Sequence, residues 1–216
     1  MSIPVTVVDY GIGNLLNVLR ALEHCGGAIQ VIDKASPAIA RADRLVLPGV
    51  GAFGDGMAEL RARGLDESVL RFAATGRPFL GICVGLQMMF DASEEMGEHR
   101  GLGLLPGRVQ AVPASGIDGR PHRVPHIGWR PLRADRPWSG TILDGVAPGE
   151  RMYFVHSFAA RAADASVRLA SVDYNGRDIC AAVQQDNLTG CQFHPERSGE
   201  AGLAVIRRFL RGEAAA

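Results

Sequence analysis

Short apolar, β-branched runs alternate along the first half of the chain with segments whose apolar residues recur at helical spacing. The strand-like runs, each bounded by turn-forming residues, lie at residues 3–8, 28–32, 44–47 and 78–82. The segments with helical spacing lie at residues 14–24, 55–75 and 84–90. Gly64 should divide the second of these segments into two short helices. Strands that alternate with helices in this way predict a doubly wound, mostly parallel sheet.

The second half has more glycine and proline and shorter intervals between strand-like runs. Its strand candidates lie at residues 108–112, 122–127, 151–155, 167–173, 179–184 and 188–193. Closely spaced strands favour antiparallel pairing. Residues 200–211 carry one apolar face at helical spacing and should form a closing helix. No repeat or linker interrupts the pattern, so we expect one α/β domain over residues 1–216, with additional antiparallel strands in its second half.

Composition argues against several classes of partner. The chain has 23 basic and 23 acidic residues and no basic stripe or acidic tail, so nucleic acid and membrane surfaces are poor candidates. No signal peptide precedes Ile3, and no apolar run approaches the length of a membrane span. The four cysteines form no C-x-x-C pair. We therefore expect a cytoplasmic protein whose thiols stay reduced and free to react.

Cys83 lies between two glycines at a predicted strand-to-helix junction. The segment Gly81-Ile82-Cys83-Val84-Gly85 has the form of a nucleophile elbow with Cys in place of Ser. Such a sharp turn leaves little room for side chains two residues on either side, which explains both glycines. The helix that follows favours a thiolate at its N-terminus and would offer the Val84 N–H to a developing oxyanion. Free cysteines are usually inert core residues, and that interpretation holds for the other three.

His194 and Glu196 form the candidate base and its orienting group. Both follow the last predicted strand, with Pro195 between them. Proline fixes its own φ and favours extended geometry at His194, and in extended backbone residues i and i+2 project to the same side. The carboxylate can then hold one ring nitrogen and leave the other free to accept a thiol proton. A lone histidine beside a strand end is usually structural, and the neighbouring Glu196 favours the catalytic interpretation.

A glycine-rich loop follows the strand at 44–47. In Leu47-Pro48-Gly49-Val50-Gly51, the two glycines permit unusual φ angles and a close approach of the backbone to a ligand. The loop is either a second oxyanion donor, through Gly51, or an ordinary turn, and the sequence leaves both interpretations open.

The sequence gives little support for a nucleotide-binding site or a metal site. Gly11-Ile12-Gly13 begins like a dinucleotide fingerprint, but Leu16 stands where the third glycine would be, and no Walker A sequence occurs. His122 and His126 have the i, i+4 spacing of metal ligands on a helix, but prolines at 121 and 125 make a helix implausible there. We expect neither a metal nor a cofactor.

Taken together, the motifs resemble a known family. The class I (triad) glutamine amidotransferases are matched by Gly81-Ile82-Cys83-Val84-Gly85-Leu86-Gln87 and Phe193-His194-Pro195-Glu196. Further segments resemble the glutaminase subunits of imidazole glycerol phosphate synthases within that family. These segments are Asp9-Tyr10-Gly11-Ile12-Gly13-Asn14, Pro48-Gly49-Val50-Gly51, Val124-Pro125-His126-Ile127-Gly128-Trp129 and Tyr153-Phe154-Val155-His156-Ser157. The resemblance covers essentially the whole chain, and the joint pattern is specific although each segment alone is not.

The resemblance implies a flavodoxin-like fold and a heterodimer with a (β/α)₈ cyclase subunit. It implies that glutamine is hydrolysed here by Cys83, His194 and Glu196. The ammonia would pass to the cyclase, which makes imidazole glycerol phosphate and an aminoimidazole carboxamide ribotide in histidine biosynthesis. Gln87 and Glu95 would hold the polar groups of glutamine.

The resemblance also implies backbone contacts to the substrate and a partner surface. Backbone groups of Gly51, His156 and Ser157 would assist in holding glutamine, and Trp129 and Tyr153 would lie towards the cyclase. Arg130 stands where the family usually has Asn, which leaves any partner contact through that position open.

Three alternatives fit the motifs less well. Another triad glutaminase, such as the one serving pyridoxal phosphate synthesis, lacks the segments at 124–129 and 153–157. A cysteine peptidase or glyoxalase-like enzyme of similar fold commonly has histidine directly after the nucleophile, where this chain has Val84. A non-catalytic flavodoxin-like module would have no need of an intact Cys83, His194 and Glu196.

Overall fold

The computed structural model describes residues 2–13 and 15–212, and within them the largest sheet has eight strands in the order β2-β1-β3-β4-β14-β13-β12-β9. Its first five strands are parallel and have the 2-1-3-4-5 order of flavodoxin-like sheets. In that order they are β2 (Gly27–Ile32), β1 (Ile3–Val8), β3 (Leu45–Leu47), β4 (Phe79–Ile82) and β14 (Leu188–Cys191). The predicted fold class is confirmed: a parallel core with antiparallel additions.

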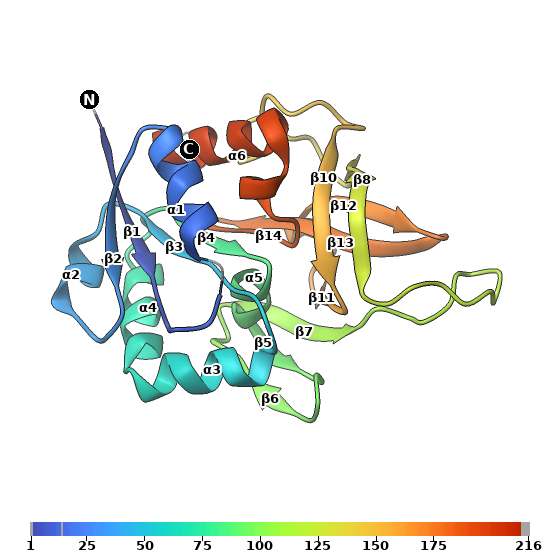
Figure 1. The fold of residues 1–216 in the computed structure, drawn as a ribbon, viewed down its shortest axis with the longest axis horizontal. Coiled ribbons are helices and arrows are strands. Elements are labelled where there is room, and N and C mark those ends of the chain that lie inside the picture. The colour runs from blue at the N-terminus through green and yellow to red at the C-terminus, as the bar shows by residue number, and fades with distance from the viewer. Residues whose placement is uncertain (1, 14, 213–216) are drawn as a thin grey trace.

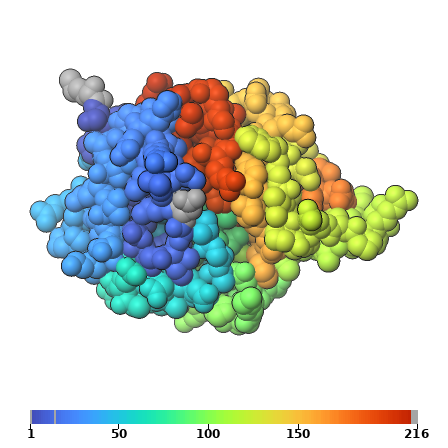
Figure 2. Space-filling view, viewed as in Figure 1, coloured from blue at the N-terminus to red at the C-terminus, as the bar shows by residue number. Residues whose placement is uncertain are grey.

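Strands from the second half extend this sheet and form two smaller ones. The antiparallel extension consists of β13 (Arg177–Gln185), β12 (Arg168–Tyr174) and β9 (Arg133–Ala134). A two-stranded sheet pairs β10 (Arg151–His156) with β8 (His126–Pro131). A four-stranded sheet contains β11 (Phe158–Ala162), β7 (Leu105–Ala111), β5 (Phe90–Ser93) and β6 (His99–Arg100). Figure 2 shows the loop between β7 and β8 projecting from one end of the molecule.

Helices cover both faces of the parallel strands (Figure 1). One face carries α1 (Leu15–His24) and α6 (Gly199–Arg211), and the other carries α3 (Phe53–Ala62) and α4 (Leu65–Ala73). Gly64 separates α3 from α4 with a left-handed φ of 65°, so the predicted break is confirmed. The short elements are α2 (Pro37–Arg41), α5 (Val84–Met88) and the 3₁₀ turns η1 (Ala165–Val167) and η2 (Pro195–Arg197). Among the residues described, no helix is both long and apolar enough to cross a membrane.

Some predicted boundaries were wrong. The helix predicted at 84–90 ends at Met88, and Phe90 begins β5, because a short apolar run does not distinguish a buried helix from a buried strand. The strand predicted at 122–127 begins only at His126, since prolines at 121 and 125 have no N–H to donate to a ladder. Asn14, predicted to begin the first helix, lies outside the described residues.

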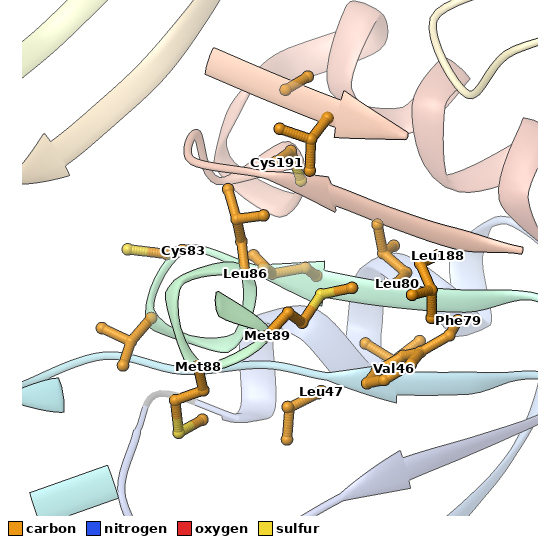
Figure 3. Packing of buried hydrophobic residues seen from close by; sticks show 14 of the residues in the cluster. Val46, Leu47, Phe79, Leu80, Cys83, Leu86, Met88, Met89, Leu188 and Cys191 are labelled. Carbon is orange, nitrogen blue, oxygen red and sulfur yellow. The ribbon is translucent and has the colours of Figure 1, made fainter. Parts of the chain in front are cut away.

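Cys83 lies where the buried core meets the edge of the sheet formed by the carboxyl ends of the parallel strands. The parallel strands β3, β4 and β14 are buried along their whole length, and Figure 3 shows Val46, Leu80 and Leu188 packed together between them. Cys83 lies at the margin of this cluster, and its side chain points away from it (Figure 3). Carboxyl ends of parallel strands are where such sheets bind ligands, and Cys83 follows β4 at that edge.

Candidate active site

Cys83 occupies a strained turn between β4 and α5. Its φ of 54° and ψ of −110° lie outside the regions that L-residues ordinarily adopt. The flanking glycines are required by close approach: a Cβ on Gly85 would lie 1.8 Å from the Leu47 carbonyl oxygen, and one on Gly81 would lie 2.8 Å from the Leu86 nitrogen. The structure therefore has the sharp elbow that the sequence predicts, with Cys83 at its apex.

The neighbouring strand β14 delivers the histidine to the same edge. Cys191 pairs with Ile82 in parallel register, and the Cys83 N–H donates to the Cys191 carbonyl over 2.8 Å. The chain then continues to His194, whose N–H donates to the Tyr153 carbonyl of β10 over 2.9 Å. Two adjacent strands thus bring together motifs that are far apart in the sequence.

His194 and Glu196 are in contact. Nδ1 of His194 lies 2.8 Å from Oε1 of Glu196, and each side chain is only 5% exposed. His194 is extended as predicted, with a φ of −97° and a ψ of 98°, whereas Pro195–Arg197 is a 3₁₀ turn. The carboxylate therefore reaches the ring through a turn and not along a fully extended segment. Burial alone would lower the pKa of His194, but interactions with Cys83 and Glu196 that favour the charged ring raise it to about 10. Nε2 has no hydrogen-bond partner of standard geometry among the described residues, although the Cys83 side chain is near enough to favour the charged ring.

A cavity of about 230 Å³ adjoins the sulfur. Its lining includes these predicted site residues: Gly51, Cys83, Val84, Gln87, Glu95, His156, Ser157 and His194. Glu196 does not line this cavity. It lines a smaller one of about 80 Å³ together with His194, and its Oε2 has no hydrogen-bond partner among the described residues. No cluster of potential metal ligands occurs in the described part of the chain.

The two polar side chains predicted to hold a substrate already have partners. Nε2 of Gln87 donates to the Phe158 carbonyl over 2.9 Å and to Oε1 of Gln192 over 3.0 Å. Oε2 of Glu95 accepts from the Phe53 N–H over 2.7 Å at the start of α3. What remains for a ligand is one carboxamide oxygen and one carboxylate oxygen, both acceptors. The site is therefore suited to a ligand that carries N–H donors.

Sequence reasoning missed Gln192. Its side chain is fully buried, and its Nε2 lies 3.6 Å from the Cys83 sulfur. A signal was present, because Gln192 is two positions before His194 and residues i and i+2 of a strand end share one side. The side chain that contacts the predicted nucleophile thus lies on the same short segment as the predicted base.

The oxyanion region is closed by a backbone carbonyl. The Val84 N–H, one predicted oxyanion donor, donates over 3.4 Å to the carbonyl of Gly49. Gly51 has a φ of 86°, a conformation that favours glycine. The carbonyl of the Gly49–Val50 peptide therefore faces the position where an oxyanion donor would be needed.

The predicted partner residues lie on the two-stranded sheet. Trp129 of β8 and Tyr153 of β10 pair across the strands with ring centroids 6.0 Å apart, and Trp129 is 44% exposed. The guanidinium of Arg197 lies over the Tyr153 ring at 4.2 Å. Arg130 lies over the Tyr174 ring at 5.4 Å, so its side chain packs against another residue of this chain.

Two buried histidines link this sheet to the cavity. Nδ1 of His126 lies 3.1 Å from Nε2 of His156, and Nδ1 of His156 lies 2.8 Å from the Phe158 carbonyl. Burial lowers the pKa of His126 from 6.5 to about 3 and that of His156 from 6.5 to about 4. The neighbouring His156 lowers the pKa of His126 further, and His194 lowers that of His156. Both rings are neutral near pH 7.

Stability should therefore fall with acid in a window set by these rings. The unfolded chain takes up protons at its histidines near pH 6.5, whereas the folded rings resist protonation down to about pH 4. The free energy of unfolding should drop by about 2 kcal/mol or more between these pH values. Urea unfolding of wild type and His126→Phe at several pH values checks this. The variant should show a shallower dependence, and His24→Gln, at an exposed ring, should match wild type. Equal slopes for His126→Phe and wild type would contradict the assignment.

Comparison with known proteins identifies relatives over nearly the whole chain. A family model described as "Glutamine amidotransferase class-I" matches residues 6–212. A Legionella pneumophila protein named imidazole glycerol phosphate synthase subunit HisH 1 is 47% identical over 210 residues, which cover 96% of this chain and 98% of the relative. A Syntrophotalea carbinolica protein named imidazole glycerol phosphate synthase subunit HisH is 47% identical over 206 residues, covering 95% and 98%.

Solved structures show the same fold at lower identity. A protein described as PurLQS from Thermotoga maritima superposes with a TM-score of 0.72 at 23% identity, covering 98% of this chain and 99% of that one. A protein described as a glutamine amidotransferase superposes with a TM-score of 0.69 at 18% identity, covering 97% and 99%.

Proposed function

The chain belongs to the class-I glutamine amidotransferases, and from that premise we propose that it is the glutaminase subunit of an imidazole glycerol phosphate synthase. It hydrolyses glutamine to glutamate and ammonia, and a cyclase subunit uses the ammonia in histidine biosynthesis. The names of its relatives support the assignment to this synthase. The observation that carries the chemistry is that Cys83 and His194 line one cavity, while Glu196 contacts the other ring nitrogen of His194.

The three side chains divide the reaction between them. The Cys83 sulfur attacks the carboxamide carbon of glutamine, and His194 carries a proton to the leaving nitrogen as the C–N bond breaks. A water molecule, deprotonated by His194, then hydrolyses the thioester and releases glutamate. Glu196 holds Nδ1 of the ring at 2.8 Å and stabilises the imidazolium formed in each step.

The acceptors in the cavity fit glutamine. The free oxygens of Gln87 and Glu95 can accept from the α-ammonium group, which provides three N–H donors. Gly51, His156 and Ser157 border the same cavity and would contribute backbone contacts. The cavity thus recognises a small molecule by its donors and leaves the reacting carboxamide beside Cys83.

The partner surface is assigned to the sheet formed by β8 and β10. Trp129 is exposed there, and Tyr153 lies between that surface and the catalytic base, because its carbonyl accepts the His194 N–H. A cyclase partner of (β/α)₈ fold that contacts Trp129 and Tyr153 would therefore touch a strand that holds the base in place.

Glutamate release in the presence of the cyclase and its ligand tests the assignment. Turnover that depends on this cyclase is expected. If glutamate is released only with a different synthase, such as the one that makes pyridoxal phosphate, the chain is a triad glutaminase of another pathway. If none is released with any partner, the proposed chemistry is wrong.

The closed oxyanion region suggests how the partner controls turnover. Rotation of the Gly49–Val50 peptide would withdraw the carbonyl that binds the Val84 N–H and present the Val50 N–H in its place. This geometry favours Val50 over Gly51 as the donor in this loop. The displaced carbonyl would have a partner available: the buried Tyr10 hydroxyl has none among the described residues, and it lies 2.5 Å from where a Cβ on Gly49 would be. Partner and cyclase ligand would favour the rotated state.

The isolated glutaminase should therefore turn glutamine over about a hundredfold more slowly than the ligand-bound heterodimer, because one oxyanion donor is worth roughly 3 kcal/mol in other hydrolases. Turnover of the isolated chain, the heterodimer and the heterodimer with cyclase ligand measures this. Tyr10→Phe removes only the hydroxyl and should lower the ligand-bound rate while leaving the isolated rate unchanged. If the isolated chain already turns glutamine over at the ligand-bound rate, control by rotation of the Gly49–Val50 peptide is ruled out.

A further inference from the structure

The carbonyl of Phe158 fixes the orientation of two buried carboxamides. A carbonyl can only accept hydrogen bonds, so the Gln87 atom that lies 2.9 Å from it must be the amide nitrogen. That same nitrogen lies 3.0 Å from the Gln192 carboxamide, which must therefore present its oxygen to Gln87. The amide nitrogen of Gln192 is then the atom directed at the Cys83 sulfur, at 3.6 Å.

We propose that Gln192 is a further member of the catalytic site, which holds the Cys83 thiolate by an N–H···S hydrogen bond, and that Gln87 acts through it as a positioning residue. The proposal rests on the function proposed above, but its direct test needs no glutamine. Sulfur in a thiolate accepts hydrogen bonds, and a donor fixed in advance stabilises the charged form without reorganisation. The same bond also limits rotation of the Cys83 side chain within the elbow.

Burial makes this contact effective. Gln192 is 0% exposed, Gln87 is 2% exposed and Cys83 is 3% exposed, so water competes weakly for the donor and the acceptor. Both N–H groups of Gln87 are used within the chain of bonds, which leaves its oxygen without a partner among the described residues, and Gln87 lines the cavity. Gln87 would then serve twice, because its nitrogen orients Gln192 and its oxygen is available to glutamine.

The pair of buried histidines, His126 and His156, is hydrogen-bonded to the same Phe158 carbonyl. The Phe158 carbonyl also accepts from Nδ1 of His156, whose Nε2 in turn accepts from Nδ1 of His126 at the start of β8. One carbonyl therefore connects the strand that carries Trp129 with the donor that holds Cys83. A shift of β8 and β10 has a direct hydrogen-bonded route to the nucleophile.

Alkylation of Cys83 by iodoacetamide across pH tests the proposal in the isolated, full-length chain. Alkylation follows the thiolate fraction, so Gln192→Leu should move the midpoint of the pH profile upwards and slow labelling near neutral pH by roughly ten- to a hundredfold, the effect of one hydrogen bond to a charged group. Mass spectrometry of the Cys83 peptide separates this thiol from the other three. Gln192→Glu, which has the shape of the wild-type side chain but lacks the donor when ionised, should also slow labelling.

Matched variants distinguish the loss of the hydrogen bond to the Cys83 sulfur from a general loss of fold. Thr189 lies on β14, three residues before Gln192, and its hydroxyl donates a buried 2.8 Å hydrogen bond to the Phe79 carbonyl of β4. Thr189→Val removes this bond and should leave the alkylation profile unchanged. Gln87→Leu should shift the profile as Gln192→Leu does, and the double variant should add little to either. An unchanged profile in Gln192→Leu, or equal shifts in Thr189→Val, would overturn the proposal. A shifted profile in a protein that never hydrolyses glutamine would instead refute only the proposed function.

Discussion

Cys83→Ala is expected to lose glutamine hydrolysis by at least about a thousandfold, because no other described group in the cavity can form the thioester. The fold should survive. Alanine keeps the Cβ that the elbow already accommodates at a φ of 54°, and the removed sulfur lies at the margin of the core (Figure 3). Glutamate release measures the loss, and thermal unfolding checks the fold.

Two controls give this result its meaning. Cys25→Ala removes a half-buried thiol whose sulfur contacts the Leu203 carbonyl on α6, far from the cavity, and should keep wild-type turnover. Ammonia supplied from outside should still support the cyclase in a complex with Cys83→Ala, because the later chemistry does not use the thiol. A Cys83→Ala protein that releases glutamate at the wild-type rate would end the assignment of the nucleophile.

His194→Ala should lower turnover by about a thousandfold or more, and Glu196→Gln should lower it at least about tenfold less. The alanine removes the proton carrier. The glutamine keeps an oxygen for Nδ1, and its amide nitrogen would take the place of Oε2, which is buried and has no partner to lose among the described residues. Steady-state kcat of the two variants in the ligand-bound heterodimer measures the difference.

Glu200→Gln is the matched control for the carboxylate. Glu200 lies only four residues further on, and its exposed side chain pairs with Arg207 on α6, so turnover should not change. Equal losses in His194→Ala and Glu196→Gln would mean that the carboxylate does more than orient and polarise the ring.

Four of the five parallel strands were predictable because they are buried on both faces along most or all of their length. Such strands appear in a sequence as continuous apolar runs between turn formers, and this pattern predicts β1, β3, β4 and β14. β6 and β9 have only two residues each, and they exist because of the strands beside them. Their pairing depends on distant residues, and local propensity carries no trace of that pairing.

In the candidate site, too, local patterns were predictable from the sequence and contacts between distant segments were not. Cys83 and the pair of His194 and Glu196 could be predicted from local sequence. The glycines around Cys83 and the proline between His194 and Glu196 are residue types that the backbone requires at those positions. Gln192 differs, because its importance arises from the Phe158 carbonyl, which lies in another sheet. The bond between the Val84 N–H and the Gly49 carbonyl also could not be foreseen, since a peptide can rotate at glycine without any change in sequence.

The pairing of Ile82 with Cys191 has a consequence for how this protein tolerates changes in length. The separation of Cys83 from His194 is set across two neighbouring strands, so the number of residues between the two motifs along the chain is of little importance. Insertions in the projecting loop at 113–123 (Figure 2) should be accepted during evolution or in engineering. Deleting a single residue within Leu188–Cys191 would reverse the side of the sheet on which every following side chain projects. His194 would then be carried away from Cys83, although neither residue had been altered.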